Sequence, residues 1–359
     1  MKPPALPTEL HFTEHEIDDD PGSLLLFWAS APSSTGIYWL TFTDGTGYVG
    51  QSVAARTRLA AHRRRWPDTV RVRFAPCSRE HLDEMERATI RHAETVQELR
   101  NKLLTNRPGG NSDLKVTVSP GQSFSLPWDR AKRGSIGPAV RPPEAAPEEA
   151  ANYALLRHVA NYHEIEGAAA SLVAGAIPSP RVSQSLLWSV SAVPSTNRSS
   201  EFRRLLAVSA GRLEILRIFE EEYKGRHFNP GFLNVSPEAA PERLVQSLRR
   251  AGLSRDDLMR GDYRVVSGVQ TLHAPSPGYL HRLLSDPFIL DTVYQLVVTM
   301  MRQGSAPLGR FHNRLLAEAV LTRAWETNAG PHDSRIAERR PKRWVRSSAQ
   351  SPTGRAGGR

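Results

Sequence analysis

The sequence contains a single cysteine, Cys77, among 359 residues. One thiol cannot form an intrachain disulfide, and zinc sites built from cysteine need two to four thiolates. A disulfide framework and a cysteine zinc cluster are therefore excluded, and a reducing cytoplasmic compartment is expected.

Long apolar runs are also missing. The most apolar stretch, 288–301, is interrupted by Asp291 and is shorter than the ~18 residues that a membrane-spanning helix requires. The first residues contain no extended apolar segment, so we expect neither a signal peptide nor a membrane partner. The pattern GxxxxGKS/T does not occur, so the sequence does not support a nucleotide motor.

Acidic residues are too few to balance the basic ones. Lys and Arg number 47 and Asp and Glu 37, which gives a net charge of +10. The excess is concentrated in residues 36–110 and in the tail 335–359, where eight basic residues accompany one acidic residue. Since 39% of the residues are apolar and 23% charged, the chain is of ordinary globular composition, long enough for about two domains at ~150 residues each. The positive excess raises the expectation of a polyanionic partner, which we take to be DNA.

Residues 36–113 show a compact alternation of strand and helix patterns, preceded by an N-terminal extension, 1–35. Within the extension, the short apolar run at 24–28 is compatible with a strand. Turn residues at 44–47 separate two strand patterns, as in a β-hairpin. The period-two and helical spacings that follow predict the order β-β-α-β-α. The expected elements are strands at 36–43, 48–51 and 70–74 and helices at 54–65 and 78–99.

The pattern changes after residue 113. Residues 114–150 are rich in Pro, Gly and Ser and are expected to form a linker or an irregular cover. Apolar positions three and four apart then predict a mostly α-helical second domain over 151–328. Its helices are expected at 152–170, 201–223, 241–251, 286–303 and 308–327.

Two further segments carry expectations of their own. Residues 242–260 are compatible with a DNA-reading helix-turn-helix, although any helical hairpin has the same pattern. Residues 329–359 form a basic, Gly-, Pro- and Ser-rich tail that we expect to be disordered.

Five residue types suited to phosphodiester chemistry fall on the elements of the first unit. Tyr38 and Tyr48 lie on the two strands of the expected hairpin, so their hydroxyls can converge. Arg58 and His62 are four residues apart and share one helix face, which presents a permanent cation beside a group that transfers protons near neutral pH. Glu86 lies at the buried border of the following helix and offers one hard oxygen ligand, as Mg²⁺ prefers.

This constellation resembles the GIY-YIG endonuclease superfamily. Gly36, Ile37 and Tyr38 supply the first motif, and Tyr48, Val49 and Gly50 supply the second. The resemblance covers about residues 36–113 and implies an α+β fold with a small sheet of a β-hairpin and one further strand. It implies that Glu86 binds Mg²⁺ or Mn²⁺, that Arg58 contacts the phosphate and that Tyr38 and Tyr48 position or activate water. It also implies that His62 supports the tyrosine acting as base, as in the restriction-enzyme branch.

An asparagine follows the glutamate helix in that superfamily, and two residues of this sequence compete for its place. Asn101 precedes a Gly-Asn-X-Asp sequence ending at Asp113, which is similar to that of some restriction enzymes, and is preferred. Asn106, just before Pro108, is the alternative.

Basic residues on the helix expected over 54–65 are assigned to binding of the DNA backbone. The alternative is an ordinary solvated helix end, because a run of charges is usually solvated. These residues are Arg56, Arg63, Arg64 and Arg65.

The sequence therefore predicts a metal-dependent endonuclease acting on DNA, with restriction or another defence role in a bacterium as the expected context. The helical domain is expected to select substrate or to mediate assembly into a homo-oligomer. The alternative is a non-catalytic nucleic-acid-binding or structural protein that retains the same fold.

Overall fold

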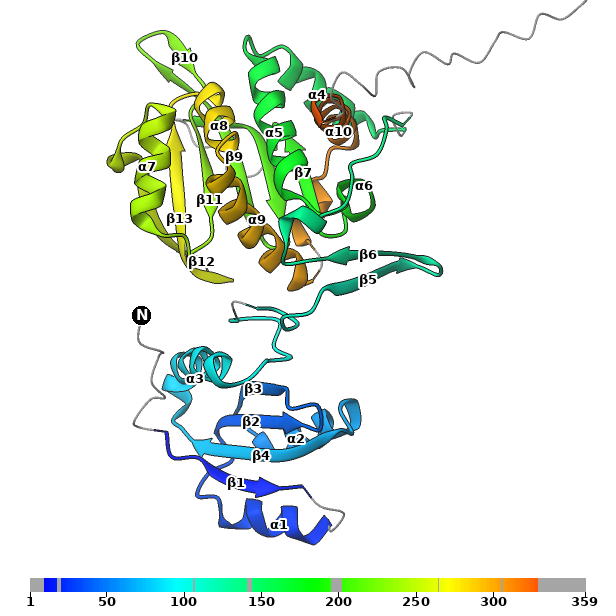
Figure 1. The fold of residues 1–359 in the computed structure, drawn as a ribbon, viewed down its shortest axis with the longest axis vertical. Helices are drawn as coiled ribbons and strands as arrows, with labels where there is room; N and C mark the ends of the chain where they lie inside the picture. Colours follow the sequence, from blue (N-terminus) through cyan, green and yellow to red (C-terminus); the bar gives the residue numbers. More distant parts are fainter. Residues whose placement is uncertain are drawn as a thin grey trace, which may run out of the picture.

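The computed structural model of this α+β protein contains two modules, which follow one another along the long axis (Figure 1). We call residues 10–113 the N-terminal module and residues 114–328 the sheet module. The basic tail and Asn106 lie outside the described residues. The structure describes residues 10–17, 21–105, 107–140, 144–194, 202–263, 265–304 and 306–328.

The N-terminal module is built on a four-stranded antiparallel sheet in the order β1-β4-β2-β3. The order β-β-α-β-α expected from residue 36 onward is confirmed. The elements are β1 (Thr13–Glu16), β2 (Gly36–Phe42), β3 (Gly47–Ser52), α2 (Ala55–Arg65), β4 (Thr69–Pro76) and α3 (Leu82–Val96).

Residues before Gly36 contribute to this module. Strand β1 extends the sheet along β4. The apolar run at 24–28, expected as a strand, lies within helix α1 (Pro21–Ser30). Its Trp28 packs edge-on against Phe74 of β4, with ring centroids 5.0 Å apart. The run is too short for its period to distinguish a strand from a helix, and this packing decides the outcome.

Strand β2 is buried on both faces because a helix covers each of them. Alternate residues of a strand point to opposite faces. Ile37 and Trp39 accordingly pack with residues of α3, whereas Tyr38 and Leu40 pack with Leu59 of α2. Helices α2 and α3 thus approach the edge strand β3 from opposite faces of the sheet.

The mostly α-helical second domain is a wrong prediction. The sheet module contains a seven-stranded antiparallel sheet in the order β12-β13-β11-β9-β8-β7, with β10 paired to β9. Its strands are β7 (Trp188–Ala192), β8 (Phe202–Ala210), β9 (Leu213–Tyr223), β10 (Arg226–Phe228), β11 (Gly231–Val235), β12 (Leu258–Tyr263) and β13 (Val266–Ala274).

The error is largest at 201–223, where the described part of the expected helix is the hairpin of β8 and β9. Apolar residues are so dense here that they satisfy helical and alternating spacings at once. Gly211 has φ +53° in the turn and lies against the backbone of Met300, a position that favours glycine. This glycine in the middle of an apolar run is the signal that the helical interpretation overlooked.

The helix-turn-helix over 242–260 is also wrong. Helix α7 (Pro241–Ala251) ends at Gly252, whose left-handed conformation closes it. A single 3₁₀ turn follows, and the expected second helix is strand β12, which pairs with β13.

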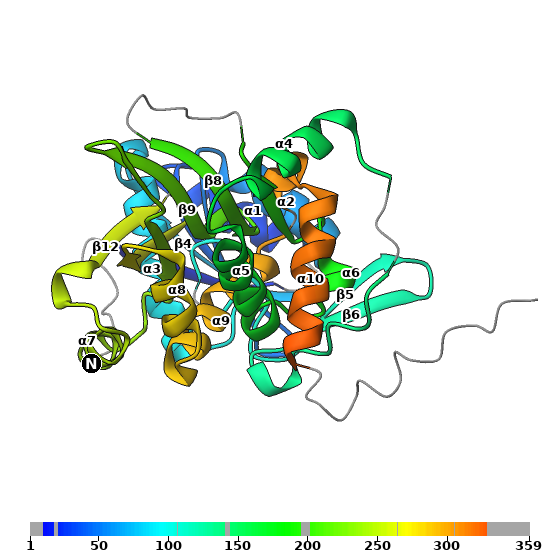
Figure 2. The same cartoon turned by 90° about the horizontal axis from the view of Figure 1, so that it is seen from above.

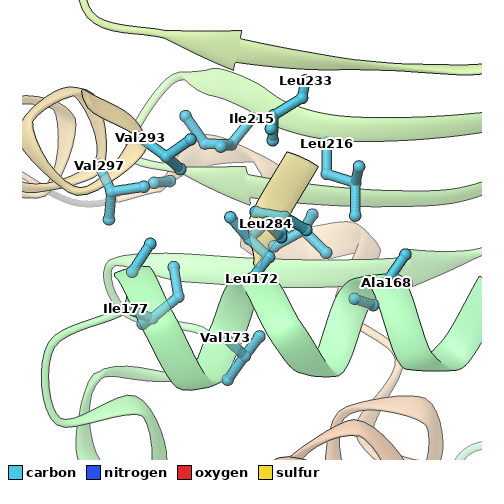
Figure 3. Close-up of a cluster of buried hydrophobic side chains, with 14 of the residues drawn as sticks. Ala168, Leu172, Val173, Ile177, Ile215, Leu216, Leu233, Leu284, Val293 and Val297 are labelled. Atoms are coloured by element: carbon cyan, nitrogen blue, oxygen red, sulfur yellow. The ribbon is translucent and has the colours of Figure 1, made fainter. Parts of the chain in front are cut away.

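Of the other expected helices, 286–303 is present, 308–327 is α-helical from Arg314 onward and 152–170 is divided in two at 158–161, whereas the helices at 180–183 and 277–284 were not expected. The prediction of a core helix at 288–301 is confirmed by α9, whose Val293 and Val297 are fully buried. They belong to the buried cluster that also contains Leu172 of α5 and Ile215 and Leu233 of strands β9 and β11 (Figure 3). Helices α5 and α10 lie side by side in Figure 2. Besides α7, the helices of this module are α4 (Pro147–Arg157), α5 (Tyr162–Ala176), α6 (Pro180–Ser183), α8 (Pro277–Leu284), α9 (Pro287–Arg302) and α10 (Arg314–Asn328).

The segment expected as a linker or irregular cover begins with a hairpin, β5 (Leu114–Ser119) and β6 (Gln122–Leu126). Beyond it, Trp128 belongs to the core of the sheet module and donates from Nε1 to the Gly110 carbonyl at 2.8 Å. The buried guanidinium of Arg302 donates to the same carbonyl at 3.1 Å and lies 4.3 Å from the Trp128 ring. These contacts join the two modules.

Among the helices that the structure describes, none combines the length and the apolar character needed to cross a membrane.

Candidate active site

A cleft of about 580 Å³ opens beside strand β3, between helices α2 and α3. We call it cleft A. Because α2 and α3 cover opposite faces of the sheet, side chains from both meet at this edge. The residues lining cleft A are Tyr48, Gln51, Arg58, His62, Arg65, Trp66, Asp83, Glu86, Arg87, Ile90, Arg100, Asn101, Lys102, Leu103, Leu104, Arg212 and Val265.

Two glycines of the resemblance motifs lie where a side chain would not fit. A Cβ at Gly36 would overlap the carbonyl oxygen of Ala75 on β4. A Cβ at Gly50 would overlap the hydroxyl of Tyr38, which crosses over this position from the neighbouring strand. Gly50 therefore allows the Tyr38 hydroxyl to lie close to the β3 backbone.

Replacing Gly50 with alanine is expected to destabilise the protein by about 1–3 kcal/mol, because the added methyl group overpacks the buried Tyr38. Gly261→Ala on β12 is the matched control, since its Cβ would meet only the Tyr263 ring at an ordinary 3.7 Å. Denaturant unfolding of both variants measures the difference. Equal stabilities would show that Tyr38 moves away without cost.

Tyr38 and His62 form a buried pair at the wall of the cleft, where His62 is a lining residue and Tyr38 lies behind it. The Tyr38 hydroxyl is 2.9 Å from His62 Nε2, and only 2% of Tyr38 is exposed. In the His62 tautomer protonated at Nδ1, the phenol donates this hydrogen bond. The imidazole stacks on Trp66 with an interplanar angle of 6°, which fixes the plane of the ring.

Tyr48 lies beside this pair and also lines the cleft. Its ring centroid is 6.2 Å from that of Tyr38 and 5.1 Å from that of His62. Burial raises the pKa of both tyrosines above the ordinary value of 10, and each phenol also perturbs the other. Both phenols are therefore protonated at neutral pH.

His62 is neutral at pH 7. Burial, with the cations of Arg58 and Arg65 nearby, lowers its pKa to about 4. A neutral imidazole can accept a proton from Tyr38, whereas an imidazolium could only donate. An anion bound in cleft A would offset the two arginines and raise this pKa.

The low pKa of His62 predicts a loss of stability in acid. Since the unfolded chain binds the proton near pH 6.5 and the folded protein only near pH 4, stability falls as the pH drops through this window. Between pH 7.5 and 5.0 the His62 contribution is about 2 kcal/mol. His62→Gln is expected to reduce the measured loss by that amount in denaturant unfolding.

The exposed His158 supplies the control for this test. His158→Gln should leave the pH dependence as in the parent, and the buried His312 contributes equally to all three proteins. An unchanged pH dependence in His62→Gln would contradict the assignment.

Glu86 is half-buried on α3, with its carboxylate held by Gln51 of β3. The backbone N–H of Gln51 donates to Oε1 and its side-chain amide donates to Oε2, each at 3.1 Å. The same amide lies 2.5 Å from Oδ1 of Asp83, one helical turn earlier. Burial is the main cause that raises the pKa of Glu86, because it makes the charged carboxylate less stable. A cation bound to the carboxylate would stabilise the charged form and lower this pKa.

The donor set suits a divalent cation of the Mg²⁺ type. Asp83 and Glu86 both line cleft A and offer carboxylate oxygens, which Mg²⁺ and Mn²⁺ accept as ligands. A carboxylate has about four lone-pair positions, so the bonds from Gln51 leave free ones on Glu86. Sequence reasoning took Glu86 as the single well-placed carboxylate of this unit; the structure adds Asp83.

Asn101, the preferred asparagine, is buried and bonded at both ends to one residue of β3. Its Oδ1 accepts from the Val49 N–H at 2.9 Å, and its Nδ2 donates to the Val49 carbonyl at 2.8 Å. This amide pairs with the edge of β3 as a neighbouring strand would. Its position supports the backbone that carries Tyr48.

The basic residues of α2 separate into two groups. Arg58 and Arg65 line cleft A, and Arg65 also lies over the Trp66 ring at 5.0 Å. Arg56, Arg63 and Arg64 are exposed and do not line cleft A.

Several lining residues were missed by sequence reasoning. Asp83 could have been found, because it precedes Glu86 by three residues on the same helix face. Arg212 and Val265 come from turns of the sheet module, after β8 and before β13, and no local pattern connects them with the first module. The cleft is thus completed by a part of the chain more than 100 residues away in sequence.

Comparisons of this chain with protein-family models, with curated proteins and with solved structures found no match.

Proposed function

We propose that the protein is a metal-dependent endonuclease that hydrolyses phosphodiester bonds of DNA in cleft A. The observation that carries the proposal is the meeting of the Tyr48, Tyr38 and His62 side chains, the cation of Arg58 and the carboxylate of Glu86 at one edge of the sheet. Hydrolysis of a phosphodiester needs all three functions: proton removal from water, a cation beside the phosphate and a site for a metal ion.

In this proposal the proton path begins at Tyr48, which is half-buried and lines the cleft. Tyr38 is buried behind it, so Tyr48 is the tyrosine that contacts a nucleophilic water. Water transfers its proton to Tyr48 as Tyr48 passes its own proton to Tyr38 and Tyr38 to His62 Nε2. Because burial raises both tyrosine pKa values, a concerted transfer avoids a free phenolate.

Arg58 provides a fixed positive charge for the phosphate. It is exposed on α2, four residues before His62 and on the same side of the helix. A guanidinium offers parallel N–H donors that match two phosphate oxygens. Its charge also lowers the pKa of both phenols, which opposes the effect of burial.

Glu86 and Asp83 would hold a Mg²⁺ or Mn²⁺ ion. When bound, such an ion neutralises the charge that develops on the phosphate oxygens during cleavage. The Gln51 amide between the two carboxylates fixes their positions.

The direct test is incubation of purified protein with supercoiled plasmid DNA in Mg²⁺, in Mn²⁺ and in EDTA. Nicked or linear DNA is expected with either metal and intact plasmid is expected in EDTA. DNA that is bound but remains intact with both metals would favour the non-catalytic alternative and overturn the proposal.

A further inference from the structure

A second cavity, of about 820 Å³, lies between the N-terminal module and the sheet module. We call it cavity B. One wall is formed by α3 and residues 104, 105 and 107, and the other by α9, residues 236–241 and residues of β12 and β13. It continues from cleft A, because Arg87, Leu104 and Val265 line both spaces.

Positive charge faces positive charge across this cavity. Arg87, Arg91 and Arg107 project from the N-terminal module and Arg260 from β12, whereas the described lining contains one acidic residue, Glu238. Cations on two facing walls repel one another unless an anion lies between them.

These four arginines differ from the arginines of the protein that are paired with carboxylates. Arg71, Arg73 and Arg181 each form an ion pair with a glutamate. Within the described residues, no ion pair within 4.0 Å involves the four arginines of cavity B. The Nε atom of Arg87 is moreover buried and has no hydrogen-bond partner. Arg107 lies over the Trp128 ring at 5.0 Å, a contact that leaves its positive charge unneutralised, so the charge of all four arginines is available to a ligand.

We propose that cavity B binds a single strand of DNA adjoining the bond that is cleaved in cleft A. This inference rests on the proposed function, since it extends the path of the same substrate. A volume of this size corresponds to a small-ligand pocket of about 300–1,000 Å³, so it fits a few nucleotides of one strand and excludes a duplex.

The lining indicates contact with phosphates without base recognition. Gln270 donates to the Ala239 carbonyl at 2.6 Å and Gln295 donates to the Trp128 carbonyl at 3.1 Å, so both side-chain amides already have partners. No aromatic side chain lines the described part of the cavity, which leaves the bases without a stacking platform. Gln303 also lines the cavity, and its Oε1 has no hydrogen-bond partner within the described residues. The four cations outnumber this single free amide, so the strand is held chiefly by its charge.

The test is equilibrium binding of the full chain in EDTA, where cleavage is blocked, to a blunt duplex and to the same duplex with an unpaired arm. The parent protein is expected to bind the armed duplex about tenfold more tightly. Arg91→Gln combined with Arg260→Gln should remove that preference and lower the salt slope for the armed duplex by about 1.4, or ~0.7 for each lost phosphate contact.

Two comparisons make the result specific. Arg157→Gln combined with Arg226→Gln removes the same charge from exposed positions on α4 and β10 and should change both affinities less than about twofold. Arg91→Lys combined with Arg260→Lys keeps the charge and should retain the preference for the arm. Equal losses in the two glutamine pairs, equal binding of both DNAs by the parent, or no binding at all would overturn the inference.

Failure of this inference is distinguishable from failure of the proposed function. Arm-dependent binding through Arg91 and Arg260 without any cleavage in Mg²⁺ would support cavity B and refute the nuclease. Cleavage in Mg²⁺ without arm-dependent binding would support the nuclease and refute the role of cavity B.

Discussion

Glu86→Ala is expected to lower metal-dependent DNA cleavage on the order of 10³-fold and to leave the fold intact. Glu86 is the half-buried carboxylate to which Gln51 donates twice, and its removal takes away the main oxygen ligand for the metal ion. The measurement is the initial rate on end-labelled duplex DNA at saturating Mg²⁺, with thermal unfolding to verify folding.

Two further variants on helix α3 are compared with Glu86→Ala: one removes the second carboxylate of cleft A, and the other removes a carboxylate outside the cleft. Asp83→Asn is expected to lower the rate less, by about 10–100-fold, because Glu86 remains. Glu84→Ala removes an equal charge from an exposed position on α3 that does not line cleft A and should leave the rate unchanged. A Glu86→Ala protein that cuts within tenfold of the parent would contradict the assignment of Glu86.

Tyr48→Phe and Tyr38→Phe are each expected to lower the cleavage rate by about 10²–10³-fold, and the double variant is expected to be little worse than the poorer single one. The two phenols transmit one proton to His62, so the loss of either interrupts the same path. Single-turnover cleavage of the three variants measures this coupling.

Tyr153→Phe is the control for the loss of a buried phenol. Its hydroxyl bonds to that of Tyr162 at 3.2 Å in the sheet module, so this variant also loses a hydrogen bond between hydroxyls but should cleave at the parental rate. Losses that multiply in the Tyr38 and Tyr48 double variant would show that the two hydroxyls act in separate steps.

The sequence was most informative where local patterns and local contacts coincide. In the first module, Glu86 follows from helical spacing alone, and the hairpin turn places Tyr38 and Tyr48 on paired strands. The order of elements could therefore be predicted over 36–96. The burial of Tyr38 could not be predicted from the sequence, because it depends on α2 covering that face of the sheet.

The sheet module was misinterpreted because its apolar residues fit two periods. Over 202–223, burial on the sheet is decided by pairing with the neighbouring strands β7 and β11, which lie outside this segment. Cavity B could not be predicted from the sequence either, since Arg91 and Arg260 come from different modules and meet only in the folded protein. Long-range packing of this kind leaves no local signal.

The central claim is that water is added across a phosphodiester bond in cleft A. The most direct measurement is cleavage of a defined duplex by the wild-type protein with Mg²⁺ in ¹⁸O-labelled water, followed by mass spectrometry of the product ends. One ¹⁸O atom in the terminal phosphate of each cut is the predicted result. Intact DNA, or cut DNA whose terminal phosphates carry no ¹⁸O, would contradict the account.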